Sequence, residues 1–213
     1  MNEPFVAGLV LATGRSRTVG RPTPLLPYAG TTLLDYTLDT ARACEFDQLL
    51  VVVDGAADKV RARVNLSGSE VVPTIDHAMG ALDPQATVLV LLRCDQPAVS
   101  PAMVRVLLAV RGDAPIAVCR YDDGRGHPIA CGREAFDDLA ALAGRHAAWR
   151  LQERPAGDVV EVPVPGRLPP DMDSWADYEA VIAAAGLTPG PELSSRAVGR
   201  AVSIRGWRRG LRG

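Results

Sequence analysis

A loop of small and basic residues follows an apolar run near the start of the chain. The run from Phe5 to Leu11 is typical of a buried strand, and the residues from Ala12 to Pro24 read Ala-Thr-Gly-Arg-Ser-Arg-Thr-Val-Gly-Arg-Pro-Thr-Pro. Backbone N–H groups in a loop of small residues can approach a phosphate closely. The loop therefore predicts a nucleotide-binding site.

The elements that must position this loop alternate between strands and helices. The apolar runs Val6–Ala12, Gln48–Asp54 and Thr87–Leu92 lack polar alternation, which is typical of strands covered on both faces. Further strands are predicted at Ala114–Cys119, His127–Cys131 (which could be antiparallel) and Val159–Val162, and helices at Thr32–Ala43, Ala56–Asn65, Asp76–Leu82, Ser100–Val110, Arg133–Leu142, Ala147–Glu153 and Ser174–Ala185. This alternation predicts an α/β fold with a doubly wound, mostly parallel sheet.

Ligand sites in such sheets lie beyond the carboxyl ends of the strands. Two segments, Ala12–Arg17 and Arg93–Pro97, directly follow runs that predict central strands. The second segment contains Asp95, a carboxylate at the end of its strand; the structural alternative is a turn or cap residue before Pro97. We therefore expect the active site where these two segments meet.

Composition limits the class of protein. The chain has 213 residues, a hydrophobic content of 47% and a formal net charge of −2. No apolar run reaches the roughly 20 residues that span a bilayer, so we expect a cytoplasmic protein without a membrane span. The four cysteines are scattered, without a Cys-x-x-Cys pair, which argues against a zinc site and a disulfide framework.

The chain is expected to divide into an α/β domain at residues 1–186 and a basic C-terminal tail at residues 187–213. The tail carries Arg196 and five later arginines, and its single acid is Glu192. A basic tail can hold nucleic acid, an anionic membrane or a protein partner, or fold back on the acidic body. A single Trp207 is too little aromatic content for base stacking, so nucleic acid is not the expected partner.

Ordered motifs of the chain resemble those of the MobA-like nucleotidyltransferases, and among these most closely the molybdenum-cofactor cytidylyltransferases. The motifs are the segment from Leu11 to Leu26, the run Thr31-Thr32-Leu33-Leu34 after Gly30, the triplets Asp95-Gln96-Pro97 and Gly126-His127-Pro128, and the closing segment from Asp171 to Asp177. Together these motifs span residues 6 to 185 and occur in the order that the family has.

The resemblance implies a Rossmann-like fold of the nucleotide-diphospho-sugar transferase type. It also implies that a nucleoside monophosphate is moved from a nucleoside triphosphate to a small phosphorylated acceptor, with release of pyrophosphate. CTP is favoured over GTP, and a pterin phosphate of the molybdenum cofactor is the suggested acceptor, with a sugar phosphate as the alternative. The implied cofactor is Mg²⁺, which prefers oxygen ligands.

The same resemblance assigns residues to roles. Asp95 and Asp173 are the implied metal ligands, with Asp171 a further candidate, although Asp173 or Ser174 could instead cap the last helix. The implied catalytic residue is Asp95; Arg15 and Arg17 are added as catalytic residues because they lie close enough in the loop to replace the missing family cations described below. The implied nucleotide-binding residues are Leu11, Ala12, Thr13, Gly14, Arg15, Ser16, Thr23 and His127.

Two positions of the first loop depart from the family pattern. Thr18 stands where the family has arginine, and Thr23 stands where it has lysine. These cations would neutralise the phosphates and the leaving pyrophosphate, so the neighbouring arginines would have to replace them.

Two readings follow: an active transferase that uses these arginines, or a catalytically inactive relative that acts as a binding or accessory protein. A dinucleotide-binding oxidoreductase is a third reading, which the missing Gly-x-Gly-x-x-Gly fingerprint argues against.

Overall fold

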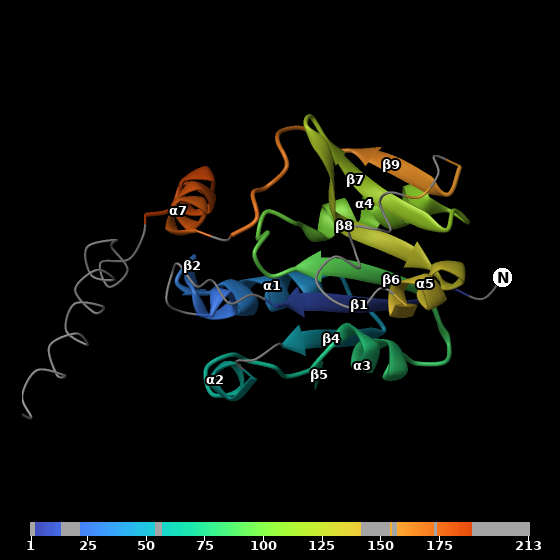
Figure 1. Ribbon diagram of the computed structural model, residues 1–213, viewed down its shortest axis with the longest axis horizontal. Coiled ribbons are helices and arrows are strands. Elements are labelled where there is room, and N and C mark those ends of the chain that lie inside the picture. Colours follow the sequence, from blue (N-terminus) through green and yellow to red (C-terminus); the bar gives the residue numbers. More distant parts are fainter. Residues whose placement is uncertain are drawn as a thin grey trace, which may run out of the picture.

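One mixed sheet of seven strands organises the described part of the chain (Figure 1). The computed structural model describes residues 3–13, 22–53, 57–141, 154, 157–172 and 174–188. In spatial order the strands are β5 (Glu70–Val72), β4 (Gln48–Val53), β1 (Phe5–Ala12), β6 (Ala86–Arg93), β8 (Gly124–Gly132), β7 (Ile116–Tyr121) and β9 (Val159–Pro163).

All neighbouring strands are parallel except at β8, which runs antiparallel to both β6 and β7. The arrowhead of β8 therefore points away from those of β1 and β4 in Figure 1. This arrangement confirms the predicted doubly wound, mostly parallel sheet, and it also confirms that the strand containing His127 is antiparallel.

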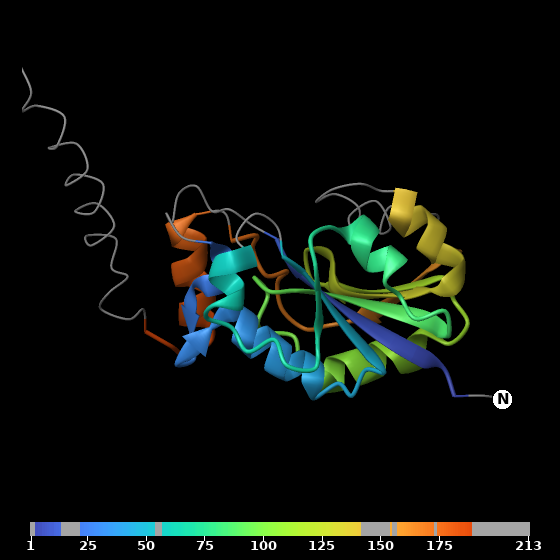
Figure 2. The same cartoon turned by 90° about the horizontal axis from the view of Figure 1, so that it is seen from below.

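Helices cover both faces of the sheet (Figure 2). Helices α1 (Leu33–Arg42) and α4 (Pro101–Arg111) pack on one face, and α3 (Ile75–Gly80) and α5 (Phe136–Ala141) pack on the other. Successive strand side chains point to opposite faces, so Val10 of β1 joins the first core cluster and Leu9 joins the second. Both are fully buried, which explains why the strand lacks polar alternation.

Side-chain caps begin the helices where the sequence predicts them. Ser100 accepts a hydrogen bond from Met103 N at the start of α4, and Thr32 does the same for Asp35 N at the start of α1. The predicted helix after residue 56 is shorter in the structure, at α2 (Ala57–Arg61), and the helix predicted from Arg133 starts with a 3-10 turn, η2 (Arg133–Ala135). The helix predicted at Ala147–Glu153 lies outside the described residues.

Three short strands were not predicted. One is the edge strand β5, and the others are the hairpin strands β2 (Pro27–Tyr28) and β3 (Thr31–Thr32). The hairpin turns at Ala29 and Gly30, whose φ angles are 49° and 84°. Positive φ at both central positions is the backbone of a type I′ turn, which matches the twist of two-residue hairpins.

Helix α7 (Trp175–Ala184) packs away from the sheet, against the segment that follows the first loop (Figure 1). Its Tyr178 is buried and donates a hydrogen bond from its hydroxyl to Pro27 O at 2.8 Å. Leu26 and Leu33 belong to the same apolar cluster. The last helix thus holds the return of the chain from the nucleotide-binding loop that the sequence predicts.

Candidate functional site

The candidate site lies at the edge of the sheet where the parallel strands end. Strand β1 ends beside β6 there, with Leu11 in register with Arg93, and Cys94 N donates a hydrogen bond to Leu11 O at 3.2 Å. The antiparallel strand β8 begins at the same edge and carries His127. The structure therefore brings together the two segments that the carboxyl-end rule selects.

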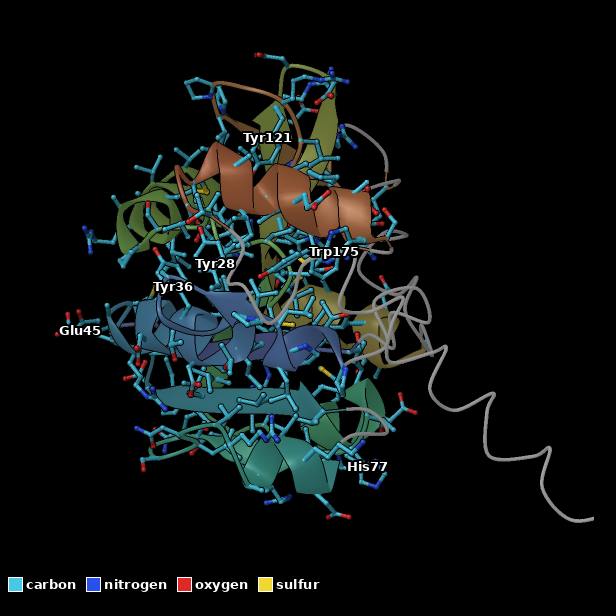
Figure 3. All side chains as sticks on the ribbon, turned by 90° about the vertical axis from the view of Figure 1, so that its left-hand side faces the viewer. Tyr28, Tyr36, Glu45, His77, Tyr121 and Trp175 are labelled. Atoms are coloured by element: carbon cyan, nitrogen blue, oxygen red, sulfur yellow. The ribbon has the colours of Figure 1, made fainter. Side chains whose placement is uncertain are left out.

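Figure 3 looks onto this edge from the side of α7. Trp175 of α7 lies on the right, Tyr28 and Tyr36 lie lower and to the left, and Tyr121, the last residue of β7, lies above them. Tyr28 and Tyr36 meet edge to face with ring centroids 4.7 Å apart.

Arg93, the last residue of β6, joins two carboxylates at the centre of this edge. Its Nε and Nη2 donate to Asp95 Oδ1 and Oδ2 at 2.9 and 2.6 Å. Its Nη1 lies 2.6 Å from Asp171 Oδ1. Both oxygens of Asp95 therefore face one guanidinium in a two-pronged pair, which is the strongest geometry that arginine makes with a carboxylate.

The Arg93–Asp95 pair is screened less by water and salt than a surface ion pair. The Asp95 side chain is 10% exposed and that of Arg93 is 27% exposed, whereas that of Asp171 is 62% exposed. Burial acts to lower the pKa of the Arg93 guanidinium, but hydrogen bonds and charge from Asp95 and Asp171 outweigh it and raise that pKa above its ordinary value. Arg93 is a permanent cation at this edge.

His127 and Gln96 present polar atoms in this buried region. His127 Nε2 and Gln96 Oε1 are both buried, and neither makes a hydrogen bond with the residues that the structure describes. Burial, and secondly the positive charge of Arg93, lower the pKa of His127 to about 3. The imidazole is therefore neutral at ordinary pH, and it can exchange a hydrogen bond with a ligand but not supply a charge.

Gly126 allows a second segment to close over His127. A Cβ at position 126 would overlap the side chain of Leu168 and lie 3.0 Å from the Tyr121 ring. Tyr121 in turn donates its hydroxyl hydrogen to His127 O at 2.8 Å. The glycine of the Gly-His-Pro motif thus permits the close approach of the segment that leads to Asp171.

The start of α7 shows which residue of the closing motif caps the helix. Ser174 is the N-cap: its hydroxyl accepts from Asp177 N at 3.2 Å, and Asp177 Oδ2 accepts from Ser174 N at 2.7 Å. The cap is therefore Ser174 and not the residue before it. Asp173 itself lies outside the described residues.

The first loop is described only at its two ends. Leu11 and Thr13 are half-buried at the end of β1, and Ala12 between them is buried. Thr23 is buried in a 3-10 turn, η1 (Thr23–Leu25), at the return of the loop. The other loop residues predicted to bind nucleotide or to act in catalysis lie outside the described residues, namely Gly14, Arg15, Ser16 and Arg17, as does Thr18.

The described residues do not fit a divalent cation as they stand. No group of three His, Cys, Asp or Glu side chains that could hold a metal ion occurs within the described ranges. Asp95 has the right oxygen chemistry, but both of its oxygens accept from Arg93. The two carboxylates of this edge are thus organised around a guanidinium.

The sequence did not predict that Arg93 pairs with two carboxylates. Arg93 was located within a candidate segment, but no contact was assigned to it. A signal was present, because a charged residue ends an otherwise apolar strand. Its partner Asp171 comes from the other end of the domain.

Comparison with known protein families shows which family the chain belongs to. A model of the MobA-like NTP transferase domain matches residues 8–159. The chain belongs to the MobA-like NTP transferase family. The match includes β1 from Gly8 onward, the first loop, Arg93, Asp95 and His127, whereas Asp171 lies beyond its end.

Relatives of this MobA-like domain carry different names. The chain is 31% identical over 172 residues to nicotine blue oxidoreductase of Paenarthrobacter nicotinovorans, covering 71% of this chain and 84% of the relative. It is 40% identical to the crystal structure of Rv0371c from Mycobacterium tuberculosis H37Rv, covering 86% of this chain and all of that one, with a TM-score of 0.80. Rv0371c has also been crystallised in complex with manganese, and that structure is 41% identical, covers 84% of this chain and 98% of its own, and has a TM-score of 0.77.

These findings confirm the family and the Rossmann-like nucleotidyltransferase fold. In the described part of this MobA-like chain, no helix is long and apolar enough to cross a membrane. The predicted basic tail lies outside the described residues from residue 189 onward.

Proposed function

We propose that the chain transfers a nucleotidyl group from a nucleoside triphosphate, with CTP favoured over GTP, to a small phosphorylated acceptor. A pterin phosphate of the molybdenum cofactor is the favoured acceptor, and a sugar phosphate is the alternative. The observation that carries this proposal is the family match over residues 8–159, which includes the end of β1, Asp95 and His127. The convergence of these residues at one carboxyl edge supports it.

In the proposed reaction, a phosphate oxygen of the acceptor attacks the α-phosphorus of the triphosphate. The bond between the α-phosphorus and the oxygen that bridges to the β-phosphate breaks, and that oxygen leaves with pyrophosphate. The chain contributes by positioning the groups and stabilising charge that develops on the oxygens. The permanent positive charge of Arg93 beside Leu11 supports such a role at this edge.

The neutral ring of His127 is proposed to bind the base or the acceptor. Its Nε2 and the Oε1 of Gln96 are buried and have no hydrogen-bond partner among the described residues. Buried polar atoms cost free energy unless a hydrogen-bond partner satisfies them. Their burial supports contact with a polar ligand group. Arg15 and Arg17 are proposed to hold the triphosphate in place of the family cations at Thr18 and Thr23.

Mg²⁺ remains part of the proposal, with Asp95 and Asp173 as its proposed ligands. The manganese complex of Rv0371c supports a divalent ion in a structural neighbour. When bound, such an ion would neutralise phosphate charge and bridge the reactants. Since Asp95 is held by Arg93 in this structure, no step of the reaction is derived through the ion.

Calorimetric titration of CTP and GTP, with and without Mg²⁺, tests the proposal. We expect CTP to bind more tightly than GTP, and we expect Asp95→Asn to weaken triphosphate binding at least tenfold, because the charge of Asp95 fixes the orientation of Arg93. Asp123→Asn is the matched control, since Asp123 pairs with Arg167 outside the site. Absence of binding at millimolar CTP and GTP would contradict a transferase and favour the inactive accessory protein.

An oxidoreductase activity is the second candidate function, and the 31% sequence identity with nicotine blue oxidoreductase favours it. The test follows the absorbance of nicotine blue mixed with NADH or NADPH and the purified chain. Bleaching of the dye in proportion to the amount of protein, with no binding of CTP or GTP, would replace the transferase proposal.

A further inference from the structure

We propose that Arg93 is a resident cation that competes with divalent metal ions for the carboxylates of Asp95 and Asp171, and that it keeps the affinity of this edge for such ions low. The inference rests on the proposed function only in taking Asp95 as a candidate metal ligand. It concerns what the carboxylates bind, and not which reaction follows.

The first argument is the geometry of the pair. The guanidinium reaches both oxygens of Asp95 and one oxygen of Asp171, and it uses each of its three nitrogens to do so. One cation thus connects Asp95 of the central motif with Asp171 of the closing motif. An ion that bridged them would need the space or the lone pairs that the guanidinium already uses.

The second argument is electrostatic. A divalent ion that shared the Asp95 oxygens would lie a few ångströms from the full positive charge of Arg93. At the effective dielectric of a protein surface, this repulsion is about ten times the thermal energy. Water reduces it little here, because the side chains of Asp95 and Arg93 are 10% and 27% exposed. The ion therefore binds well only when the guanidinium has left.

The third argument is that the backbone of Arg93 holds a fixed position relative to the turn that carries Asp95. It is the last residue of β6 and is paired in register with Leu11 of β1. The backbone N of Gln96 donates to Arg93 O, which ties the turn carrying Asp95 to the end of the strand. The two-pronged pair is thus part of the fold, and its contact with the more exposed Asp171 is the weaker arm.

Removal of the guanidinium leaves a buried carboxylate without its cation. Such a group costs free energy and gains strongly from any replacement cation. The inference therefore predicts that Arg93→Met binds a divalent ion more tightly than the native chain, which is the opposite of what the loss of a binding residue would do.

The experiment titrates Mn²⁺ into the full chain, without nucleotide, and measures free Mn²⁺ by its electron paramagnetic resonance signal. We expect Arg93→Met to lower the Kd for Mn²⁺ at least tenfold relative to the native chain. The double variant Arg93→Met, Asp95→Asn should lose that gain. The matched control Arg167→Met removes an arginine from an exposed pair with Asp123 and should bind Mn²⁺ as the native chain does.

An unchanged or higher Kd in a folded Arg93→Met variant overturns the inference. If that variant does not fold, Arg93→Gln decides, because glutamine keeps an N–H donor for Asp95 but carries no charge; a Kd lowered at least tenfold supports the inference and an unchanged one overturns it. The assay contains no nucleotide, so its failure leaves the transferase proposal standing. Failure of nucleotide binding likewise leaves this result intact.

Discussion

The body of the sheet and its carboxyl edge share strands β1, β6 and β8. Side chains in the body make apolar contacts, whereas those at the edge make ion pairs and hydrogen bonds. In the body, Leu89 of β6 is fully buried among apolar side chains from both neighbouring strands and the covering helices. At the edge, Arg93 of the same strand meets two carboxylates, and His127 Nε2 finds no hydrogen-bond partner in the part of the chain that the structure describes. Strand β6 therefore runs from a core in which apolar side chains pack closely to an edge where a buried polar atom lacks a hydrogen-bond partner among the described residues.

This difference indicates that a ligand gains more binding free energy at the carboxyl edge than in the body of the sheet. Buried apolar residues are satisfied by contact alone, whereas a buried polar atom without a partner costs free energy until something binds it. The edge also holds the charges that a phosphate or an ion would meet. Stability should therefore depend mainly on the body, and ligand affinity on the edge.

The largest effect that separates the two regions is expected for Leu89→Ala. Removal of this fully buried side chain should lower the free energy of unfolding by about 2–5 kcal/mol, through lost burial and the cavity left behind. Urea unfolding measures the loss, and ligand affinity of the folded fraction should stay unchanged. Val106→Ala is the control, because Val106 on α4 is 50% exposed and its truncation should cost far less. Equal losses of unfolding free energy in the two variants would contradict the view that stability depends mainly on the body of the sheet.

The next effect is a pH dependence that belongs to the edge. The folded chain holds the pKa of His127 at about 3, while an unfolded chain takes up this proton near the ordinary value of 6.5. The free energy of unfolding therefore falls as pH drops from about 6.5 toward 3, by about 2 kcal/mol for this group between pH 7 and pH 5.

Urea unfolding at pH 7 and pH 5 tests this dependence in His127→Gln. The variant should lose less stability than the native chain between the two values, because glutamine has no proton to gain. His77→Gln, on the exposed surface of α3, is the control and should follow the native chain. A native pH dependence in His127→Gln would mean that other groups carry it.

The smallest effect is expected for Gly126→Ala. The added methyl group would overlap Leu168 and press on the Tyr121 ring, but the end of the Leu168 side chain can move aside, so we expect a loss of about 1 kcal/mol. Gly80→Ala is the control, since a Cβ there meets no atom within 4 Å. Thermal unfolding of the two variants measures the difference. A stability loss in Gly80→Ala as large as in Gly126→Ala would show that the close approach to Leu168 is not its cause.

The sequence predicted the body of the sheet better than its short elements. Runs such as Gln48–Val53 are long and apolar, so burial on both faces is evident from composition alone. The hairpin at Pro27–Thr32 has two residues in each strand, which is too short for any periodic pattern. Its turn also uses a positive φ at Ala29, a residue that does not signal such a turn.

The order of the predicted strands indicated where the candidate site lies, but it did not indicate which side chains contact one another there. The carboxyl-end rule selected the segments Ala12–Arg17 and Arg93–Pro97 because it depends only on strand direction. The pairing of Arg93 with Asp171 depends on how the chain returns across β8, past Gly126 and Leu168. Such tertiary contacts are not encoded in the spacing of nearby residues. The roles predicted for Arg15, Arg17 and Asp173 stay predictions.

The contact between Tyr178 and Pro27 also has a consequence for biosynthesis. The two residues are 151 positions apart, and their hydrogen bond joins the last described helix to the return of the first loop. During translation, β1 and the first loop leave the ribosome early, but the apolar face of Leu26 and Leu33 remains uncovered until α7 has emerged. Closing so long a loop is entropically costly and is a late event in folding. The candidate site at this edge is thus completed only when nearly the whole domain has been synthesised.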